Sequence, residues 1–176
     1  MTGMEIKSVV LECLRCGRCC TDLLAEDMGV LRGLTLLPDE RKHFPEPVVR
    51  PAVGLGGRPH ERGFRVIAYQ LTENTCPHLG GNACKIYADR PASCRQYPFS
   101  LGRGSDGAEL MGLDLNCPSL LAVLAENPRP RFAFEARPYA EWLRDLGLEA
   151  ESRPDMAWFF DLRGEKWIRY SELSEG

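Results

Sequence analysis

Four cysteines lie within eight residues near the N-terminus, in the block Cys13-Leu14-Arg15-Cys16-Gly17-Arg18-Cys19-Cys20. Burial of this small side chain in a core does not require such clustering. Two-residue spacers let the chain curl so that successive sulfurs converge on one ion or cluster, with the backbone N–H groups pointing at the thiolates. The block therefore indicates a metal or iron–sulfur site.

The rest of the chain carries four further cysteines, Cys76, Cys84, Cys94 and Cys117. Eight cysteines would suggest four disulfides in a secreted protein. The first ten residues have no long apolar run typical of a secretory signal, so we expect a cytoplasmic protein, and in a reducing compartment clustered cysteines favour metal binding. We predict that all eight are metal ligands: Cys13, Cys16, Cys19, Cys20, Cys76, Cys84, Cys94 and Cys117.

The composition narrows the class of protein. The chain has 176 residues and is 44% hydrophobic, which suits one compact domain with its own core. Its net charge of −3 argues against a general binder of nucleic acids or anionic membranes, because such proteins are normally basic. No apolar stretch reaches the roughly 18 residues of a membrane span. The expected partners are a metal ion or iron–sulfur cluster and a protein redox partner, with no nucleic acid and no membrane.

The elements that position the cysteines are short. The apolar spacing and the Gly and Pro positions predict helices over 22–31, 38–44, 120–126 and 137–146, a helical turn over 92–96, strands over 48–53, 64–71 and 109–115, and a terminal hairpin over 157–170. The expected fold is a single α+β domain over 1–176, with an irregular, loop-rich metal-site core, short helices and short antiparallel strands. Residues 10–120 form its cysteine-cluster metal-binding region, and residues 121–176 cover the core.

Two local features bear on the second set of cysteines. Gly80-Gly81-Asn82 predicts a turn that folds Cys76 back towards Cys84. Pro91 suits the first turn of a helix, whose N–H groups could face an anionic site. Arg90 and Arg95 are candidates for stabilising thiolates from outside the ligand set, and His78 is a further candidate ligand that eight cysteines make unnecessary.

The spacing leaves the metal open between zinc and iron–sulfur. Both accept four thiolates in tetrahedral surroundings. A C-x2-C-x2-C run with a distant Cys-Pro pair, at Cys76 or Cys117, favours an iron–sulfur cluster of the [4Fe–4S] type over zinc. The ferredoxin spacing would require a fourth cysteine at position 23, where this chain has Leu23. Cys20, which is adjacent to Cys19, fits a second site or a different corner of a cluster. One site and two four-cysteine sites both remain possible.

Several ordered elements together resemble the CxxCxxCC family of zinc- or iron-chelating proteins. They are the Cys13–Cys20 block, Cys76-Pro77, the segment from Gly81 to Phe99 and Cys117-Pro118. The resemblance covers about residues 10–120 and implies a cysteine-rich metal or iron–sulfur centre. A related cysteine cluster is found in flagellin lysine methylases.

Three classes of function are consistent with these residues. The first is a redox or electron-transfer protein with an iron–sulfur cluster. The second is a structural or interaction module stabilised by zinc. The third, suggested only by the resemblance, is an accessory of a protein-modifying, methylation-type enzyme. The sequence has no Ser-His-Asp arrangement, P-loop or nucleotide fingerprint, and Leu23 breaks the radical-SAM spacing, so whether the chain is an enzyme stays open.

Overall fold

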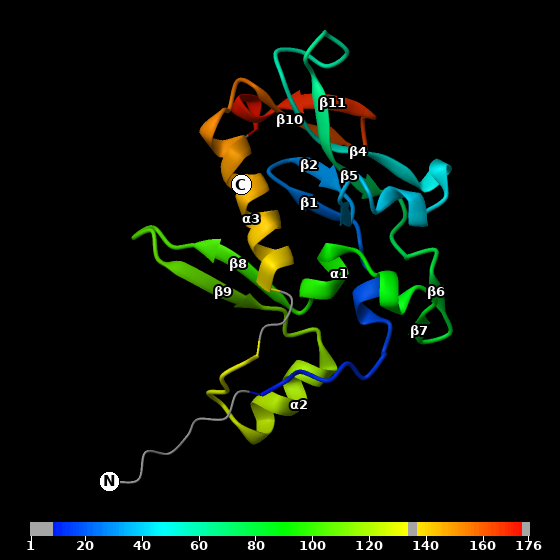
Figure 1. The fold of residues 1–176 in the computed structure, drawn as a ribbon, viewed down its shortest axis with the longest axis vertical. Coiled ribbons are helices and arrows are strands. Elements are labelled where there is room, and N and C mark those ends of the chain that lie inside the picture. Colours follow the sequence, from blue (N-terminus) through cyan, green and yellow to red (C-terminus); the bar gives the residue numbers. More distant parts are fainter. Residues whose placement is uncertain (1–8, 134–136, 174–176) are drawn as a thin grey trace.

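Five antiparallel strands form the main sheet of the molecule, in the order β11-β10-β4-β5-β3 (Figure 1). The computed structural model describes residues 9–133 and 137–173. The strands of this sheet are β3 (Thr35–Leu36), β4 (Val49–Leu55), β5 (Arg65–Leu71), β10 (Ala157–Asp161) and β11 (Lys166–Arg169). Strand β10, from the end of the chain, thus pairs with β4 and is an interior strand of the sheet.

Three two-stranded hairpins and three α-helices complete the α+β fold of the described residues. The hairpins are β1 (Ala25–Asp27) with β2 (Val30–Arg32), β6 (Leu79–Gly80) with β7 (Ala83–Cys84), and β8 (Phe99–Arg103) with β9 (Glu109–Leu113). The helices are α1 (Ala92–Gln96), α2 (Pro118–Glu126) and α3 (Arg137–Ser152). Short 3-10 turns are η1 (Arg18–Cys20), η2 (Arg41–His43), η3 (Glu46–Val48), η4 (Tyr87–Asp89) and η5 (Tyr170–Glu172).

The helix predicted over 22–31 is wrong, because this segment forms the β1–β2 hairpin. Asp27 pairs with Val30 across the two-residue loop Met28-Gly29. Both loop residues have positive φ angles, 50° and 77°, as a type I′ turn requires. Of the apolar residues that suggested a helix, Leu31 lies in β2 and Met28 in the loop, and the rest lie in the lead-in, where Leu23 N–H donates to Asn74 O at 3.0 Å.

Most other elements fall where the sequence places them. Strands β4, β5 and β9, helices α1, α2 and α3, and the β10–β11 hairpin confirm the predictions over 48–53, 64–71, 109–115, 92–96, 120–126, 137–146 and 157–170. The expected helix over 38–44 is only the 3-10 turn η2, and strand β8 was not predicted. The type of these elements was therefore predictable, and the exceptions are short strands of hairpins, whose type depends on the strand they pair with.

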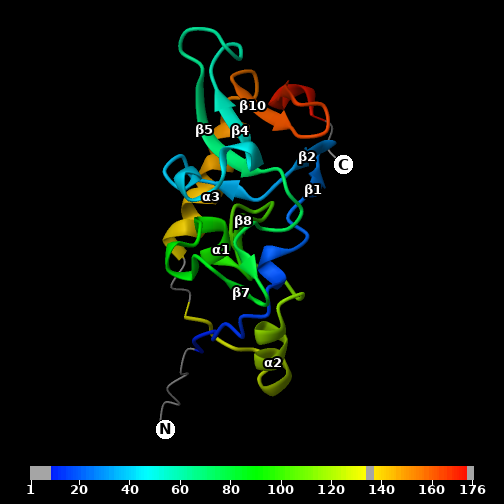
Figure 2. The same ribbon diagram turned by 90° about the vertical axis from the view of Figure 1, so that its right-hand side faces the viewer.

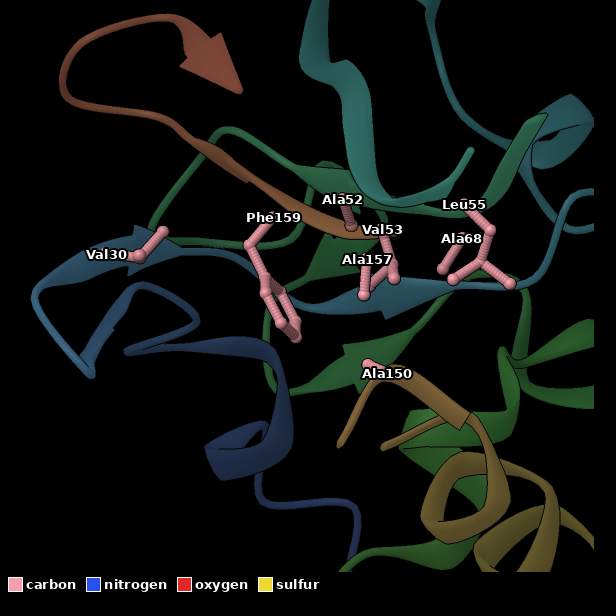
Figure 3. Packing of buried hydrophobic residues seen from close by; sticks show 8 residues of the cluster. All are labelled: Val30, Ala52, Val53, Leu55, Ala68, Ala150, Ala157 and Phe159. Carbon is pink, nitrogen blue, oxygen red and sulfur yellow. The ribbon is translucent and has the colours of Figure 1, made fainter. Parts of the chain in front are cut away.

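The hydrophobic core lies between the sheet and helix α3 (Figure 3). Half of its eight buried members are alanines, so strands and helix approach closely. The members are Val30, Ala52, Val53, Leu55, Ala68, Ala150, Ala157 and Phe159. The sheet occupies one end of the molecule, and α1, α2 and the cysteine-bearing loops lie towards the other (Figure 2).

Gln70 is a buried polar side chain, 1% exposed, inside this sheet. Its Oε1 accepts the N–H of Gly33 at 2.9 Å, and its Nε2 donates to Pro51 O at 2.8 Å and to Phe160 O at 2.9 Å. Gly33 itself has no room for a Cβ, because that atom would overlap Leu71 O. One amide therefore joins the β2–β3 connection, β4 and β10.

Asp161, at the end of β10, is buried and accepts three backbone N–H groups, from Leu31 at 2.9 Å, Gly164 at 2.8 Å and Arg163 at 3.4 Å. Burial raises the pKa of this carboxyl, but the three hydrogen bonds and the Arg163 charge outweigh it and hold the pKa below its usual range. The ionised carboxylate thus fastens the β1–β2 hairpin to β10.

This contribution to stability should disappear in acid. A lowered folded-state pKa means that the stabilisation is complete above the unfolded pKa of about 4 and is lost as the pH falls through the lower folded value. We expect Asp161→Asn to lower the free energy of unfolding in urea at pH 7 by about 2 kcal/mol, with the difference from wild type shrinking below about pH 4. The exposed Asp155→Asn is the control. A pH-independent difference between wild type and Asp161→Asn would contradict the role of the charge.

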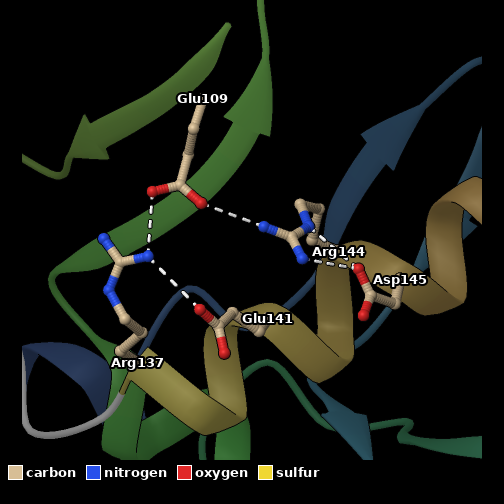
Figure 4. Close-up of polar contacts among 5 residues, drawn as sticks. All are labelled: Glu109, Arg137, Glu141, Arg144 and Asp145. Atoms are coloured by element: carbon tan, nitrogen blue, oxygen red, sulfur yellow. Dashed lines mark hydrogen bonds and ion pairs between the residues drawn. The ribbon is translucent and has the colours of Figure 1, made fainter. Parts of the chain in front are cut away.

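An ion-pair network holds the β8–β9 hairpin against α3 (Figure 4). Glu109 accepts from Arg137 Nη1 at 2.9 Å and from Arg144 Nη1 at 3.0 Å. Arg137 also pairs with Glu141, and Arg144 with Asp145. The two arginines lie seven residues apart on α3, so one carboxylate bridges two turns of the helix.

Within the described residues, no helix combines the length and apolar character needed to cross a membrane.

Candidate metal centre

All eight cysteines line a single cavity of about 470 Å³. They lie on separate parts of the fold: the Cys13–Cys20 loop, the residues after β5, strand β7, helix α1 and the start of α2. The cysteine members are Cys13, Cys16, Cys19, Cys20, Cys76, Cys84, Cys94 and Cys117. None of them is in a disulfide. The structure therefore brings together the whole set of residues that the sequence singled out.

The Cys13–Cys20 loop is tightly curled. Arg15 and Gly17 have positive φ angles of 52° and 76°, and Cys20 N–H donates to Gly17 O at 2.9 Å to close the η1 turn. A Cβ on Gly17 would lie 3.1 Å from Leu79 Cδ1, so both backbone angle and space favour glycine. Arg15 N–H donates to Cys13 Sγ at 3.4 Å, the kind of N–H to sulfur contact expected of a metal-binding loop.

Two contacts connect this loop to later cysteines. An antiparallel bridge between Thr21 and Thr75 sets Cys20 opposite Cys76, whose N–H donates to Cys20 O at 2.8 Å. Leu14 N–H donates to the Ser119 hydroxyl at 3.1 Å, which joins the loop to the start of α2. The backbone thus fixes the first four cysteines beside both Cys-Pro segments.

The second region folds back as the glycine turn predicts. Strands β6 and β7 form a hairpin with Leu79 paired to Cys84, and Gly81 in the connecting turn has a φ of 61°. Lys85 N–H donates to His78 O at 2.9 Å. Cys76 and Cys84 consequently reach the same cavity.

Helix α1 carries Cys94, but its first N–H does not face the cysteine site. Ala92 N–H donates to Glu40 Oε1 at 2.7 Å, and the Ser93 hydroxyl donates to Thr35 O at 2.6 Å. The anion that this helix start faces, as the sequence predicted it could, is therefore the carboxylate of Glu40. These contacts anchor the helix to the β3 region.

The Cys20 thiol lies between two other sulfurs. Cys20 has one thiol proton, which it can donate to either neighbour, and this contact lowers the pKa of Cys19, to about 7, and that of Cys76, to about 6. Burial opposes both shifts, while the Arg90 charge further favours the Cys19 thiolate and the backbone N–H of His78 favours that of Cys76. The same contact raises the pKa of Cys20. The Cys20 contact thus favours a thiolate, the form that binds metal, at Cys19 or Cys76.

Two neighbouring groups are held neutral. Burial raises the pKa of the Cys94 thiol, and the nearby Cys19, Cys76 and Cys84 sulfurs add to the shift. Burial also raises the pKa of Tyr97, helped by the Asp114 carboxylate and by the Cys117 sulfur. A cation placed among these sulfurs would relieve their mutual repulsion and favour the thiolate of Cys94.

Arginines and tyrosines form most of the remaining polar wall of the cavity. Arg90 and Arg15 both lie over the Tyr87 ring, 3.6 and 5.0 Å from its centroid. Arg95 donates to Arg90 O at 2.7 Å and to Ala88 O at 2.8 Å. Arg95 therefore orders the backbone before α1, and Arg90 is the arginine whose charge favours the thiolates of both Cys19 and Cys94.

Some residues of the site were not identified from the sequence. Tyr139, from α3, lines the cavity and accepts a hydrogen bond from Arg95 at 3.3 Å, although the C-terminal third showed no chemistry of its own. Nothing in the sequence indicated that Ser119 belongs to the site, apart from its position near Cys117. His78 does not line the cavity, because its Nε2–H donates to His43 O at 2.6 Å.

The donor set suits a thiophilic metal centre. Within 9–133 and 137–173, no three Cys, His, Asp or Glu side chains are grouped closely enough to hold one ion as they stand. The eight sulfurs instead surround a shared volume. Thiolate-only surroundings match zinc or iron–sulfur, and ordering of the ligands on metal binding is a normal part of such sites.

Comparison with known proteins agrees with the donor set. A family model named CxxCxxCC, with the description "Putative zinc- or iron-chelating domain", matches residues 12–118. No match to the chain was found among curated proteins or among solved structures.

Proposed function

We propose, from the premise that the chain belongs to the CxxCxxCC family of zinc- or iron-chelating domains, that its eight cysteines hold an iron–sulfur centre that transfers electrons. The observation that carries the proposal is the convergence of all eight thiols on one cavity of about 470 Å³. The proposed ligands are those eight cysteines, and the proposed location is a reducing compartment, the cytoplasm.

The size of the cavity supports a cluster more than a lone ion. A structural zinc ion needs four sulfurs at about 2.3 Å, and that sphere leaves part of the volume unfilled. An iron–sulfur cluster, such as [4Fe–4S], spreads its cysteine ligands around a larger inorganic core. Bound here, it would supply reversible one-electron chemistry, while Arg90 and the neighbouring N–H groups would offset its negative charge.

One observation favours a structural zinc role as the second candidate. Cys20 and Cys76 belong to a buried cluster with Leu36, Phe44 and Leu71. A metal bound there would stabilise the fold directly, as structural zinc does. This role needs no redox activity.

Metal and sulfide analysis separates the two candidates. From anaerobically purified protein we expect iron with acid-labile sulfide and a brown absorbance that dithionite bleaches. The same preparation after mild chelation serves as the blank for adventitious iron. Zinc without sulfide, and a flat visible spectrum, would overturn the redox proposal and leave the structural one.

A further inference from the structure

Strand β9 is the outer strand of the β8–β9 hairpin, and all five of its residues are exposed. The hairpin projects from the molecule with β8 on the side of α3 (Figure 1). Leu110, Met111 and Leu113 are 55%, 41% and 37% exposed. This strand therefore presents an apolar surface that the described residues leave uncovered.

The register shows which backbone groups of β9 face outwards. Asp114 N–H donates to Pro98 O and Gly104 N–H to Ala108 O, each at 2.8 Å, so the even-numbered residues of the hairpin form its hydrogen-bonded pairs. The N–H and C=O groups of Glu109, Met111 and Leu113 then point away from β8. Over 9–133 and 137–173, no further strand pairs with this edge.

The edge has little of the usual protection against strand pairing. Free edges in natural sheets are kept short or carry charged side chains, prolines or bulges, and the five residues Glu-Leu-Met-Gly-Leu of β9 include no proline, no bulge and one charged side chain. Its one charged residue, Glu109, is held by Arg137 and Arg144 (Figure 4). The ion pairs also fix the hairpin on α3, so that the edge is presented in one orientation.

We propose that β9 pairs with β9 of a second copy of this chain, antiparallel about a two-fold axis at Met111. The charge pattern selects this register. Glu109 then faces Leu113 of the partner subunit, whereas a parallel, in-register pair would oppose two Glu109 carboxylates, which is unfavourable. Met111 meets Met111 of the partner subunit, and the outward N–H and C=O groups of both strands are satisfied. The pairing is independent of the metal centre.

The area of contact sets the strength of this dimer. Strand β9 has five residues, about 17 Å of edge, and two such edges bury less than the roughly 1,200 Å² of a stable interface. The dimer is therefore transient, as interfaces below that size typically are. It forms a four-stranded sheet in the order β8-β9-β9-β8.

Sedimentation equilibrium of the full-length chain, from about 10 μM to about 1 mM, tests the pairing over the concentrations at which weak association is detected. The weight-average mass should rise from the monomer value of 19.7 kDa towards twice that value. Met111→Pro removes one outward N–H but no N–H that β8 uses, and should weaken association at least tenfold. Leu121→Lys, at an exposed leucine of α2, is the control and should associate like wild type.

Amide exchange of the wild-type chain tests the register without any variant. At high protein concentration, the amides of Glu109, Met111 and Leu113 should exchange more slowly, whereas those of Leu110 and Gly112, already paired with β8, should not change. A constant monomer mass, or Met111→Pro associating as strongly as wild type, would overturn the pairing. A constant mass would mean that any strand that pairs with this edge belongs to a different protein.

Discussion

Cys76→Ser should lose bound metal and unfold at a temperature about 10 °C lower than wild type. Cys76 is 7% exposed, shares a hydrogen bond with Cys20 and packs beside Leu71. A serine oxygen is a poor ligand for zinc or a cluster in an otherwise sulfur site. Because metal binding contributes to folding, about 3 kcal/mol of lost stability corresponds to that shift for a chain of this size. Metal content and thermal unfolding by circular dichroism measure both effects.

The matched control is Ala83→Ser, which adds a hydroxyl at an exposed position beside Cys84 without removing sulfur. It should keep the wild-type metal content and melting temperature. Cys13→Ser, at an exposed cysteine of the same cavity, should also lose metal but with a smaller loss of stability, because Cys13 is outside the buried cluster. Full metal content and an unchanged melting temperature in Cys76→Ser would refute Cys76 as a ligand.

Gln70→Leu should destabilise the sheet by about 4 kcal/mol. The substitution removes the partners of Gly33 N–H, Pro51 O and Phe160 O, and each buried polar group left without a partner costs about 1–3 kcal/mol. The added apolar surface recovers only part of this cost. Urea unfolding at neutral pH measures the loss from the shift of the midpoint at constant slope.

Gln96→Leu is the comparison, since it makes the same chemical change at a partly exposed glutamine. It should change the free energy of unfolding by less than about 1 kcal/mol. Equal stability of Gln70→Leu and wild type would mean that water or a backbone shift satisfies the three groups. Metal content should be unchanged in both variants, which separates this effect from that of the cysteines.

The residues of the site were more predictable than the surroundings that complete it. Thiol spacing is a local property, so the Cys13–Cys20 block was readable from the sequence as a metal-binding motif, whereas its convergence with Cys117 comes from the fold. Tyr139 reaches the cavity only because α3 packs against α1. No periodicity within residues 137–152 indicates that contact.

Prediction of the fold from the sequence was limited in the same way, because contacts outside a segment decided its structure. The apolar spacing over 22–31 satisfies a helix and a hairpin equally, and the positive φ angles of Met28 and Gly29 decide between them. Strand β8 exists through its pairing with β9, and the place of β10 beside β4 depends on residues far away in sequence. Such choices are made by tertiary packing rather than by local preference.

The position of β10 also has a consequence for biosynthesis. Trp158 Nε1–H donates to Gly56 O across 102 residues, so this part of the sheet closes only after β10 has been made. All eight cysteines leave the ribosome before β10 does, at a stage when the edge of β4 has no partner. Closing so long a loop is entropically costly and slow. Metal bound early by the cysteine region would keep the nascent chain compact until β10 has been made and can pair with β4.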